Sequence, residues 1–192
     1  MNREVKGIIR TENPEEHWGF LPIENETILD LGCGINNQEY LPTPMYWVQK
    51  GAKMVYGVDP GQESYNWFKQ NFNVKNFINI MDWIDRTEKF DLYMKAIKPS
   101  VMKIDVEGSE IFLNAINPLN LDGIRHIGIE YHNLSCLLSC EHILRDNGYE
   151  LTYYKFDHLD IDYQGVLHAH KKNIIIKQRN NGSITSEETK EI

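Results

Sequence analysis

Cysteine is scarce in this sequence, with only Cys33, Cys136 and Cys140 among 192 residues. An odd and small number of cysteines excludes a disulfide framework as the main source of stability. Cys136 and Cys140 are spaced for one face of a helix and His142 follows them, but no further pair of ligands completes a zinc site. We therefore expect the cysteines to pack in the core, and we predict no metal site.

Long hydrophobic runs are also absent. No stretch approaches the roughly 20 apolar residues that a membrane span requires, and charges at Arg3, Glu4 and Lys6 stand where a secretion signal has an apolar block. We therefore expect an intracellular, cytoplasmic protein without a membrane span. Because 192 residues suffice for one substantial core but not for two ordinary domains, we expect a single domain over residues 1–178 and a polar, mobile tail over residues 179–192.

Basic residues are outnumbered, with 20 Lys and Arg against 28 Asp and Glu and a formal net charge of -8. The basic residues are scattered, and only Lys171 and Lys172 are adjacent. Nucleic-acid binding depends on concentrated positive charge that neutralises phosphates, so we expect no nucleic-acid partner. A small-molecule or glycan substrate that offers a hydroxyl group fits this composition better.

Apolar strand-like segments alternate with helix-like segments along most of the chain. The pattern predicts strands at 27–34, 53–59, 76–80, 101–106 and 125–132, and helices at 44–50, 63–72, 84–97, 108–116 and 134–146. Two final strands, at 149–156 and 166–177, have no convincing helix between them. Repeated strand and helix units predict a Rossmann-like α/β fold, with a mostly parallel sheet, helices on both faces and an antiparallel edge strand.

A glycine-rich turn follows the first of these strands. Asp30, Gly32 and Gly34 lie at its end, and Asp59 lies at the end of the next strand. Glycines let the backbone approach a ligand closely, and a carboxylate at this position can accept hydrogen bonds from ribose hydroxyls, so we predict a nucleoside site. A tight turn with an exposed acid and no ligand is the alternative. A dinucleotide is disfavoured, because residues 35–37 are Ile-Asn-Asn where its pyrophosphate cradle needs a glycine.

Asp82 and Trp83 follow the third strand, at the ligand-bearing edge of such a sheet. Asp82 could accept a hydrogen bond from an adenine amino group, and the indole of Trp83 could stack on the base. The alternative is that Asp82 caps a helix and Trp83 packs in the core.

Acidic side chains recur at the exits of two further strands. Lys103, Asp105 and Glu107 alternate along one strand, and Glu130 and His132 alternate along the next. Charges are rare inside a central parallel strand, so we predict that these side chains converge on a catalytic site where His132 is a candidate general base. The alternatives are an ion pair between Lys103 and Asp105, a helix cap by Glu107 and a structural hydrogen bond by His132.

Four other polar or aromatic residues stay ambiguous. His168 and His170 share one face of a late strand, where we do not expect a metal. His17 and Trp18 precede the first predicted strand and either form a lid or pack in the core.

The segment KIDVEGSE at residues 103–110 resembles the signature of FkbM-type methyltransferases. Three further stretches agree in order with that family: LDLGCGIN at 29–36, VDPG at 58–61 and IEYH at 129–132. The resemblance runs from about residue 27 to residue 133 and departs at Asn36, where the family usually has a glycine, and in the short spacing between Asp59 and Asp82.

This resemblance implies a class I methyltransferase fold, S-adenosyl-L-methionine (SAM) as methyl donor and a hydroxyl oxygen on a sugar, glycolipid or other natural product as acceptor. The residues Asp30, Gly32, Gly34 and Asp59 would then hold SAM. Acceptor binding and proton removal would fall to Asp105, Glu107, Glu130 and His132. A non-catalytic SAM-binding module and, with less support, a nicotinamide-dependent enzyme are the alternatives.

Overall fold

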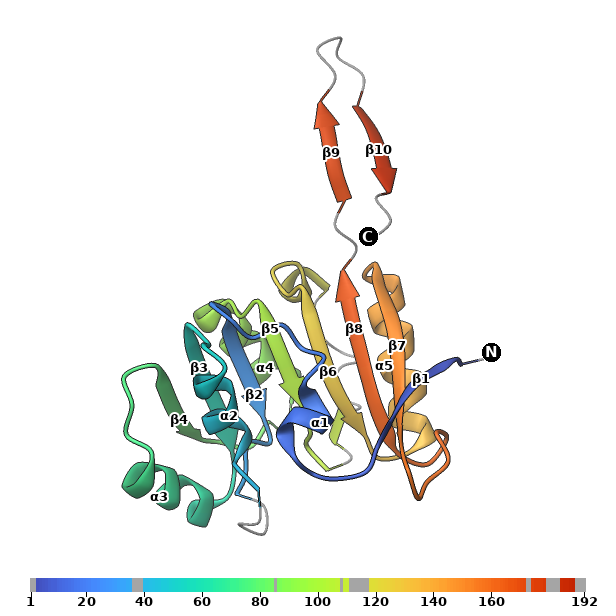
Figure 1. The fold of residues 1–192 in the computed structure, drawn as a ribbon. Helices are drawn as coiled ribbons and strands as arrows, with labels where there is room; N and C mark the ends of the chain where they lie inside the picture. Colours follow the sequence, from blue (N-terminus) through green and yellow to red (C-terminus); the bar gives the residue numbers. More distant parts are fainter. Residues whose placement is uncertain are drawn as a thin grey trace.

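The structure is a computed structural model that describes residues 3–35, 40–84, 86–107, 109–110, 118–171, 174–178 and 184–188. Strands and helices alternate from residue 27 to residue 146, as the hydrophobic pattern predicts (Figure 1). The strands here are β2 (Thr27–Leu31), β3 (Met54–Asp59), β4 (Phe77–Met81), β5 (Val101–Ile104) and β6 (His126–Tyr131). The helices are α2 (Thr43–Gln49), α3 (Gln62–Asn71), α4 (Thr87–Ile97), the 3-10 helix η2 (Pro118–Leu121) and α5 (Leu134–Asp146). Most of the helix predicted at 108–116 lies outside the described residues.

The strands form one eight-stranded sheet with the order β1-β7-β8-β6-β5-β2-β3-β4. It includes β1 (Val5–Ile9), β7 (Tyr149–Phe156) and β8 (Gly165–Lys171). Only β8 is antiparallel to its neighbours β6 and β7, and the other pairs are parallel. The predicted Rossmann-like α/β class is confirmed, and the antiparallel strand lies third from one edge because β7 and β1 continue the sheet beyond it.

Alternating strand residues bury the two faces of the sheet in separate clusters. Leu29 of β2 packs with residues of α4, η2 and α5 on one face, whereas Ile28 packs with residues of α2 and α3 on the other. Figure 1 shows α4 and α5 behind the sheet and α2 in front of it. Each face therefore has its own apolar layer. The charged exceptions on the central strands are Asp30 of β2, Lys103 of β5 and Glu130 of β6, which are all buried.

The N-terminal segment was not predicted as part of the sheet. Strand β1 pairs in parallel with β7, and Arg3 donates to both carboxylate oxygens of Glu141 on α5 at 2.8 and 2.9 Å. The short helix α1 (Pro14–Trp18) follows, with the Asn13 side chain accepting a hydrogen bond from the Glu15 amide as its N-cap. This segment covers the face that also carries α2 (Figure 1).

The C-terminal strand predicted at 166–177 corresponds to β8 and β9 (Ile174–Gln178), and residues 172–173 between them are not described. β9 pairs with β10 (Ile184–Glu188) in a separate antiparallel sheet. Part of the predicted tail is therefore a strand, and the rest of residues 179–192 lies outside the described residues. Among the described residues, no helix combines the length and apolarity needed to cross a membrane.

Candidate functional site

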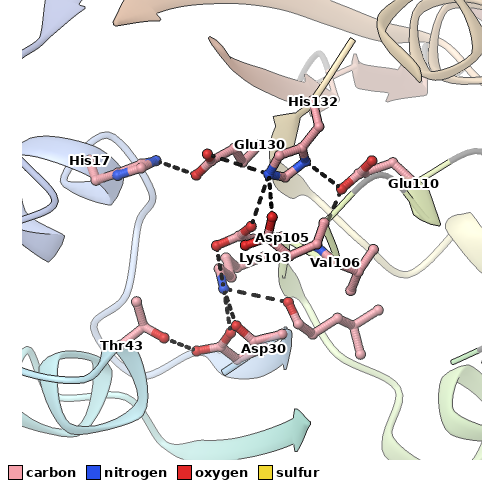
Figure 2. A network of polar contacts seen from close by, with 12 residues as sticks. His17, Asp30, Thr43, Lys103, Asp105, Val106, Glu110, Glu130 and His132 are labelled. Atoms are coloured by element: carbon pink, nitrogen blue, oxygen red, sulfur yellow. Dashed lines mark hydrogen bonds and ion pairs between the residues drawn. The ribbon is translucent and has the colours of Figure 1, made fainter. Parts of the chain in front are cut away.

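The carboxyl ends of the adjacent strands β2, β5 and β6 bring the predicted polar residues together. Lys103 is the central group, with 1% of its surface exposed. Its Nζ lies 3.3 Å from an oxygen of Asp30 and 3.3 Å from an oxygen of Asp105, and it donates to the Gly32 carbonyl at 2.7 Å (Figure 2). Burial lowers the pKa of Lys103, but the charges of Asp30 and Asp105 outweigh burial and hold it above its ordinary value. Lys103 therefore stays charged and ties the glycine turn to β5.

Asp30 is enclosed by other protein groups. Its Oδ2 accepts hydrogen bonds from the Thr43 hydroxyl at 2.6 Å and from the Trp47 indole at 2.7 Å. The side chain is fully buried and lines neither of the two cavities described below. The structure thus places Asp30 behind the turn as an anchor for Lys103 and α2, whereas the sequence predicts a direct contact with the ligand.

The glycine turn passes close to both neighbouring strand exits. Gly32 has a φ of 75°, and a Cβ atom at this position would overlap the Asp105 carbonyl oxygen. A Cβ on Gly34 would lie 3.1 Å from Asp59 Oδ2. Only glycine at position 32 lets the turn pass so close to the Asp105 backbone. Asp59 and Asp105 therefore lie on either side of one small space next to the turn.

That space is a cavity of about 290 Å³. Its lining includes Gly32, Gly34, Asp59, Trp83, Asp105 and Glu107. Trp83 is 58% exposed and forms part of the wall, so the alternative that it packs in the core is wrong. The cavity thus joins most of the residues predicted to hold a nucleoside.

Asp82 does not line this cavity. Its carboxylate accepts hydrogen bonds from Lys89 Nζ at 2.8 Å, from the Trp83 amide at 2.8 Å and from the Tyr93 hydroxyl at 2.7 Å. The hydrogen bond from Lys89 is the main cause that lowers the pKa of Asp82. Asp82 is not a helix cap either, because α4 begins at Thr87 with Arg86 as its N-cap residue. The carboxylate instead fixes the loop between β4 and α4 behind Trp83.

A second cavity, of about 420 Å³, opens on the other side of the glycine turn. Its walls come from β1, α1, the segment at 40–43 and the exits of β5, β6 and β7, and they include His17, Lys103, Glu130, His132 and Gln164. The two cavities share Gly32, Gly34, Asp105 and Glu107. These four residues therefore form the boundary at which molecules in the two cavities would meet.

His132 is the centre of a carboxylate cluster at this boundary (Figure 2). Its Nδ1 lies 3.0 Å from Glu110 Oε1. Its Nε2 lies 3.4 Å from Glu107 Oε2, 3.6 Å from Glu130 Oε1 and 3.8 Å from Asp105 Oδ1. Burial lowers the pKa of His132, but the hydrogen bond to Glu110 and the surrounding carboxylates outweigh it and raise the pKa to about 9. Burial raises the pKa of Asp105 to about 6, against the opposing charge of Lys103.

The structure adds two residues that the sequence did not single out for this site. His17 Nε2 lies 2.9 Å from Glu130 Oε2, and Gln164 donates to Glu130 Oε1 at 2.7 Å. Burial raises the pKa of Glu130, but the hydrogen bond and charge of His17 outweigh burial and hold the pKa below its ordinary value. The prediction that His17 packs in the core is confirmed, since the centroid of its ring lies 4.6 Å from that of Trp18 in a stacked arrangement. The ring also forms part of the cavity wall.

Glu110 was also missed, although it belongs to the KIDVEGSE segment. It is fully buried, and its position at the end of that segment, three residues after Glu107, is the sequence signal that pointed to this edge. The three cysteines are all buried, as predicted.

Comparisons with known proteins agree on the fold. No protein-family model and no curated protein matches the chain. Among solved structures, it is similar to fibrillarin from Aeropyrum pernix with natively bound SAM, with 19% identity and a TM-score of 0.55 over 78% of this chain and 68% of that one. It is also similar to a proposed SAM-dependent methyltransferase from Listeria monocytogenes, with 11% identity and a TM-score of 0.53 over 81% of this chain and 95% of that one.

A further similar structure is a proposed hemolysin from Streptococcus thermophilus, with 18% identity and a TM-score of 0.51. The match covers 80% of this chain but only 62% of the length of that protein. At such identities the likeness establishes the fold alone: this chain has the Rossmann-like fold that these methyltransferase structures share.

Proposed function

We propose that this protein is a SAM-dependent methyltransferase that transfers a methyl group to a hydroxyl oxygen of a sugar, glycolipid or other small natural product. The observation that carries this proposal is the boundary at Gly32, Gly34, Asp105 and Glu107, where the two cavities meet. Methyl transfer is an in-line displacement, which requires the donor carbon and the acceptor oxygen at near-contact distance. Two cavities that open onto a common boundary meet this requirement.

The smaller cavity suits the donor. Asp59 stands at the end of β3, where its carboxylate would accept hydrogen bonds from ribose hydroxyls, and the exposed indole of Trp83 would stack on adenine. Asp105 and Glu107 on the opposite wall would face the positive sulfonium. The similar fibrillarin and Listeria structures support SAM as the ligand of this cavity.

The larger cavity suits a hydroxylated acceptor. Its walls mix carboxylates, imidazoles and the Gln164 amide, which are groups that exchange hydrogen bonds with sugar hydroxyls. Asp105 and Glu107 would shape this space, and Glu130 with His132 would orient the hydroxyl. A carboxylate of this cluster would accept the hydroxyl proton, because the raised pKa of His132 keeps its ring protonated at neutral pH. The FkbM-type subtype remains part of the proposal, and it depends on the KIDVEGSE segment that supplies Asp105, Glu107 and Glu110.

Calorimetric titration tests the donor site. We expect SAM and its demethylated product to bind in the micromolar range, about -8 kcal/mol, and we expect NAD not to bind. Asp59→Ala should weaken SAM binding at least tenfold, whereas Asp146→Ala, an exposed substitution on α5, should not change it. Binding of NAD in place of SAM would overturn the proposed function.

Transfer of radiolabelled methyl from SAM to cell extracts tests the chemistry. We expect label in glycans or small hydroxylated molecules, and we expect Glu107→Gln and His132→Ala to abolish labelling. SAM binding should be retained in His132→Ala, because His132 does not line the donor cavity. Label in RNA or protein would overturn the acceptor class. SAM binding without any transfer would instead indicate a non-catalytic module.

A further inference from the structure

Asp105, Glu107 and His132 each offer one potential metal-ligand atom in a small group. These atoms, two carboxylate oxygens and one ring nitrogen, all lie within 4.8 Å of one another. Glu130 adds a further oxygen 3.6 Å from His132 Nε2 (Figure 2). Across the part of the chain that the structure describes, this is the one group of histidine, cysteine and acidic residues that converges so closely.

The orientation of His132 distinguishes this group from a patch of surface acids. Its Nδ1 contacts Glu110, whose side chain is fully buried, at 3.0 Å. A buried carboxylate behind the ring favours a proton on Nδ1, so a cation would bind the ring through Nε2 and displace the proton that the surrounding carboxylates otherwise hold there. Metal-binding histidines in proteins commonly have this carboxylate support on the distal nitrogen.

The spacing also suits a cation. With metal–ligand bonds of about 2.1 Å, neighbouring ligand atoms lie roughly 3.0 to 3.5 Å apart in octahedral or tetrahedral geometry. The Glu107 and Asp105 oxygens lie 3.4 and 3.8 Å from His132 Nε2. Glu107 is 87% exposed and so has freedom to move, which means that small side-chain adjustments would complete the coordination.

Charge gives an independent argument for a cation. Asp105, Glu107, Glu110 and Glu130 all lie within 4 Å of the His132 ring nitrogens. The positive groups beside these four carboxylates are Lys103, which is shared with Asp30, and the rings of His132 and His17 when they are protonated, so acids still outnumber bases here. Buried or half-buried carboxylates are costly unless they are paired with opposite charge, and one divalent cation would balance two of them.

We propose that Asp105, Glu107 and His132 bind a divalent cation such as Mn²⁺ at the boundary of the two cavities, with Glu130 beside it. The oxygen-rich ligand set with one imidazole favours Mn²⁺ over metals that prefer thiolates. The role of the cation rests on the proposed function: it would hold the acceptor through its hydroxyl, best through two neighbouring hydroxyls, and lower the pKa of the one that reacts.

The balanced step follows from that role. The hydroxyl proton passes to a neighbouring carboxylate, and the oxygen forms a bond with the methyl carbon. The carbon–sulfur bond breaks with its electron pair on sulfur, so the positive sulfonium becomes a neutral thioether. The acceptor class is therefore a sugar or other metabolite with vicinal hydroxyls.

Electron paramagnetic resonance of free Mn²⁺ tests the site on chelator-treated, metal-free protein without SAM. We expect one Mn²⁺ per chain, and we expect Glu107→Gln and His132→Gln each to weaken binding at least tenfold. His170→Gln is the matched control, because His170 is also a partly buried imidazole beside a carboxylate, with its Nε2 3.3 Å from Glu150, but lies outside the cluster. The exposed Glu107 variant keeps the test valid if His132→Gln fails to fold.

Parallel titrations with Mn²⁺ and with SAM decide the proposal. Failure to bind Mn²⁺ at millimolar concentration, or equal binding by wild type and both cluster variants, would overturn the metal site. A parallel titration with SAM separates the metal site from the proposed function. Mn²⁺ binding without SAM binding supports the metal site and overturns the methyltransferase proposal. SAM binding without Mn²⁺ binding overturns the metal site and leaves the methyltransferase proposal standing. If both bind, methyl transfer should stop with chelator and return with Mn²⁺.

Discussion

His168 on β8 provides a prediction about stability that does not depend on function. Its ring contacts Phe20 at 4.8 Å between centroids, and its Nε2 lies 3.2 Å from Nδ1 of His126 on β6. Burial is the largest cause that lowers the pKa of His168, followed by the nearby charges of His126, His170 and Lys6, and together they bring it to about 3. The folded protein therefore strongly favours the neutral imidazole.

The sign of the effect follows from linkage. The unfolded chain binds a proton at an ordinary pKa of 6.5, whereas the folded chain does so only near 3. Above pH 6.5 both states are neutral at His168 and the full stability is present. As pH falls from 6.5 toward 3, the unfolded state gains the proton before the folded state does, so the free energy of unfolding decreases. The decrease is about 2 kcal/mol at pH 5 relative to pH 7 or above.

Urea unfolding at pH 7 and pH 5 measures this loss. His168→Gln removes the titration while keeping a polar side chain, so we expect its loss of unfolding free energy between the two pH values to be smaller than that of wild type by about 2 kcal/mol. His142→Gln, at an exposed position on α5, should retain the wild-type pH dependence. An equal pH dependence in His168→Gln and wild type would refute the reasoning.

Three further predictions concern the turn, the buried ion pair and the N-terminal strand. Gly32→Ala should lower the free energy of unfolding by more than about 3 kcal/mol, because the added Cβ would overlap the Asp105 carbonyl oxygen at a residue with positive φ. Gly123→Ala is the control: its Cβ would have no atom within 4 Å, so the free energy of unfolding should change by less than about 0.5 kcal/mol. Lys103→Met should cost about 3 kcal/mol by leaving Asp30 without its cation, and adding Asp30→Asn should recover part of that loss in a double-mutant cycle of urea unfolding. Arg3→Met should speed hydrogen exchange of the β1 amides relative to those of the central strands, and unchanged protection there would contradict an anchoring role.

The central fold was accessible to sequence reasoning because its elements have strong patterns. Apolar runs that end in Gly or Asp predict β2 and β3 to within three residues at each end, and the 3.6-residue period predicts α5 from Leu134 to Asp146. β1 was missed because its five residues include Lys6 and Gly7 and lack a strong apolar run. Only its partner β7, almost 150 residues later in the chain, makes it a strand.

The candidate site was predictable as a location but less so in its individual roles. Topology places the exits of the parallel strands β5 and β6 at one edge, which explains why Asp105, Glu107, Glu130 and His132 were brought together as predicted. Sequence could not reveal which carboxylates are already bound by neighbouring side chains, because those partners, such as Trp47 for Asp30, come from other elements.

Asp30, which is held by protein side chains, and Asp105, which lines the cavities, have different roles in stabilising the acidic site. Asp30 accepts hydrogen bonds from neutral donors and contacts Lys103, so it fixes that cation at the level of the glycine turn. Lys103 in turn offsets part of the charge of Asp105, which faces the cavities and whose pKa burial raises to about 6. Asp105 in the cavity therefore depends on Asp30 behind the turn. Without Asp30 the Lys103 ammonium would lose one of its two ion pairs. Without that ammonium, less positive charge would offset the repulsion between Asp105 and Glu130. The buried pair therefore positions charge for the boundary between the cavities, which gives a physical reason for a lysine in the middle of the otherwise apolar strand β5.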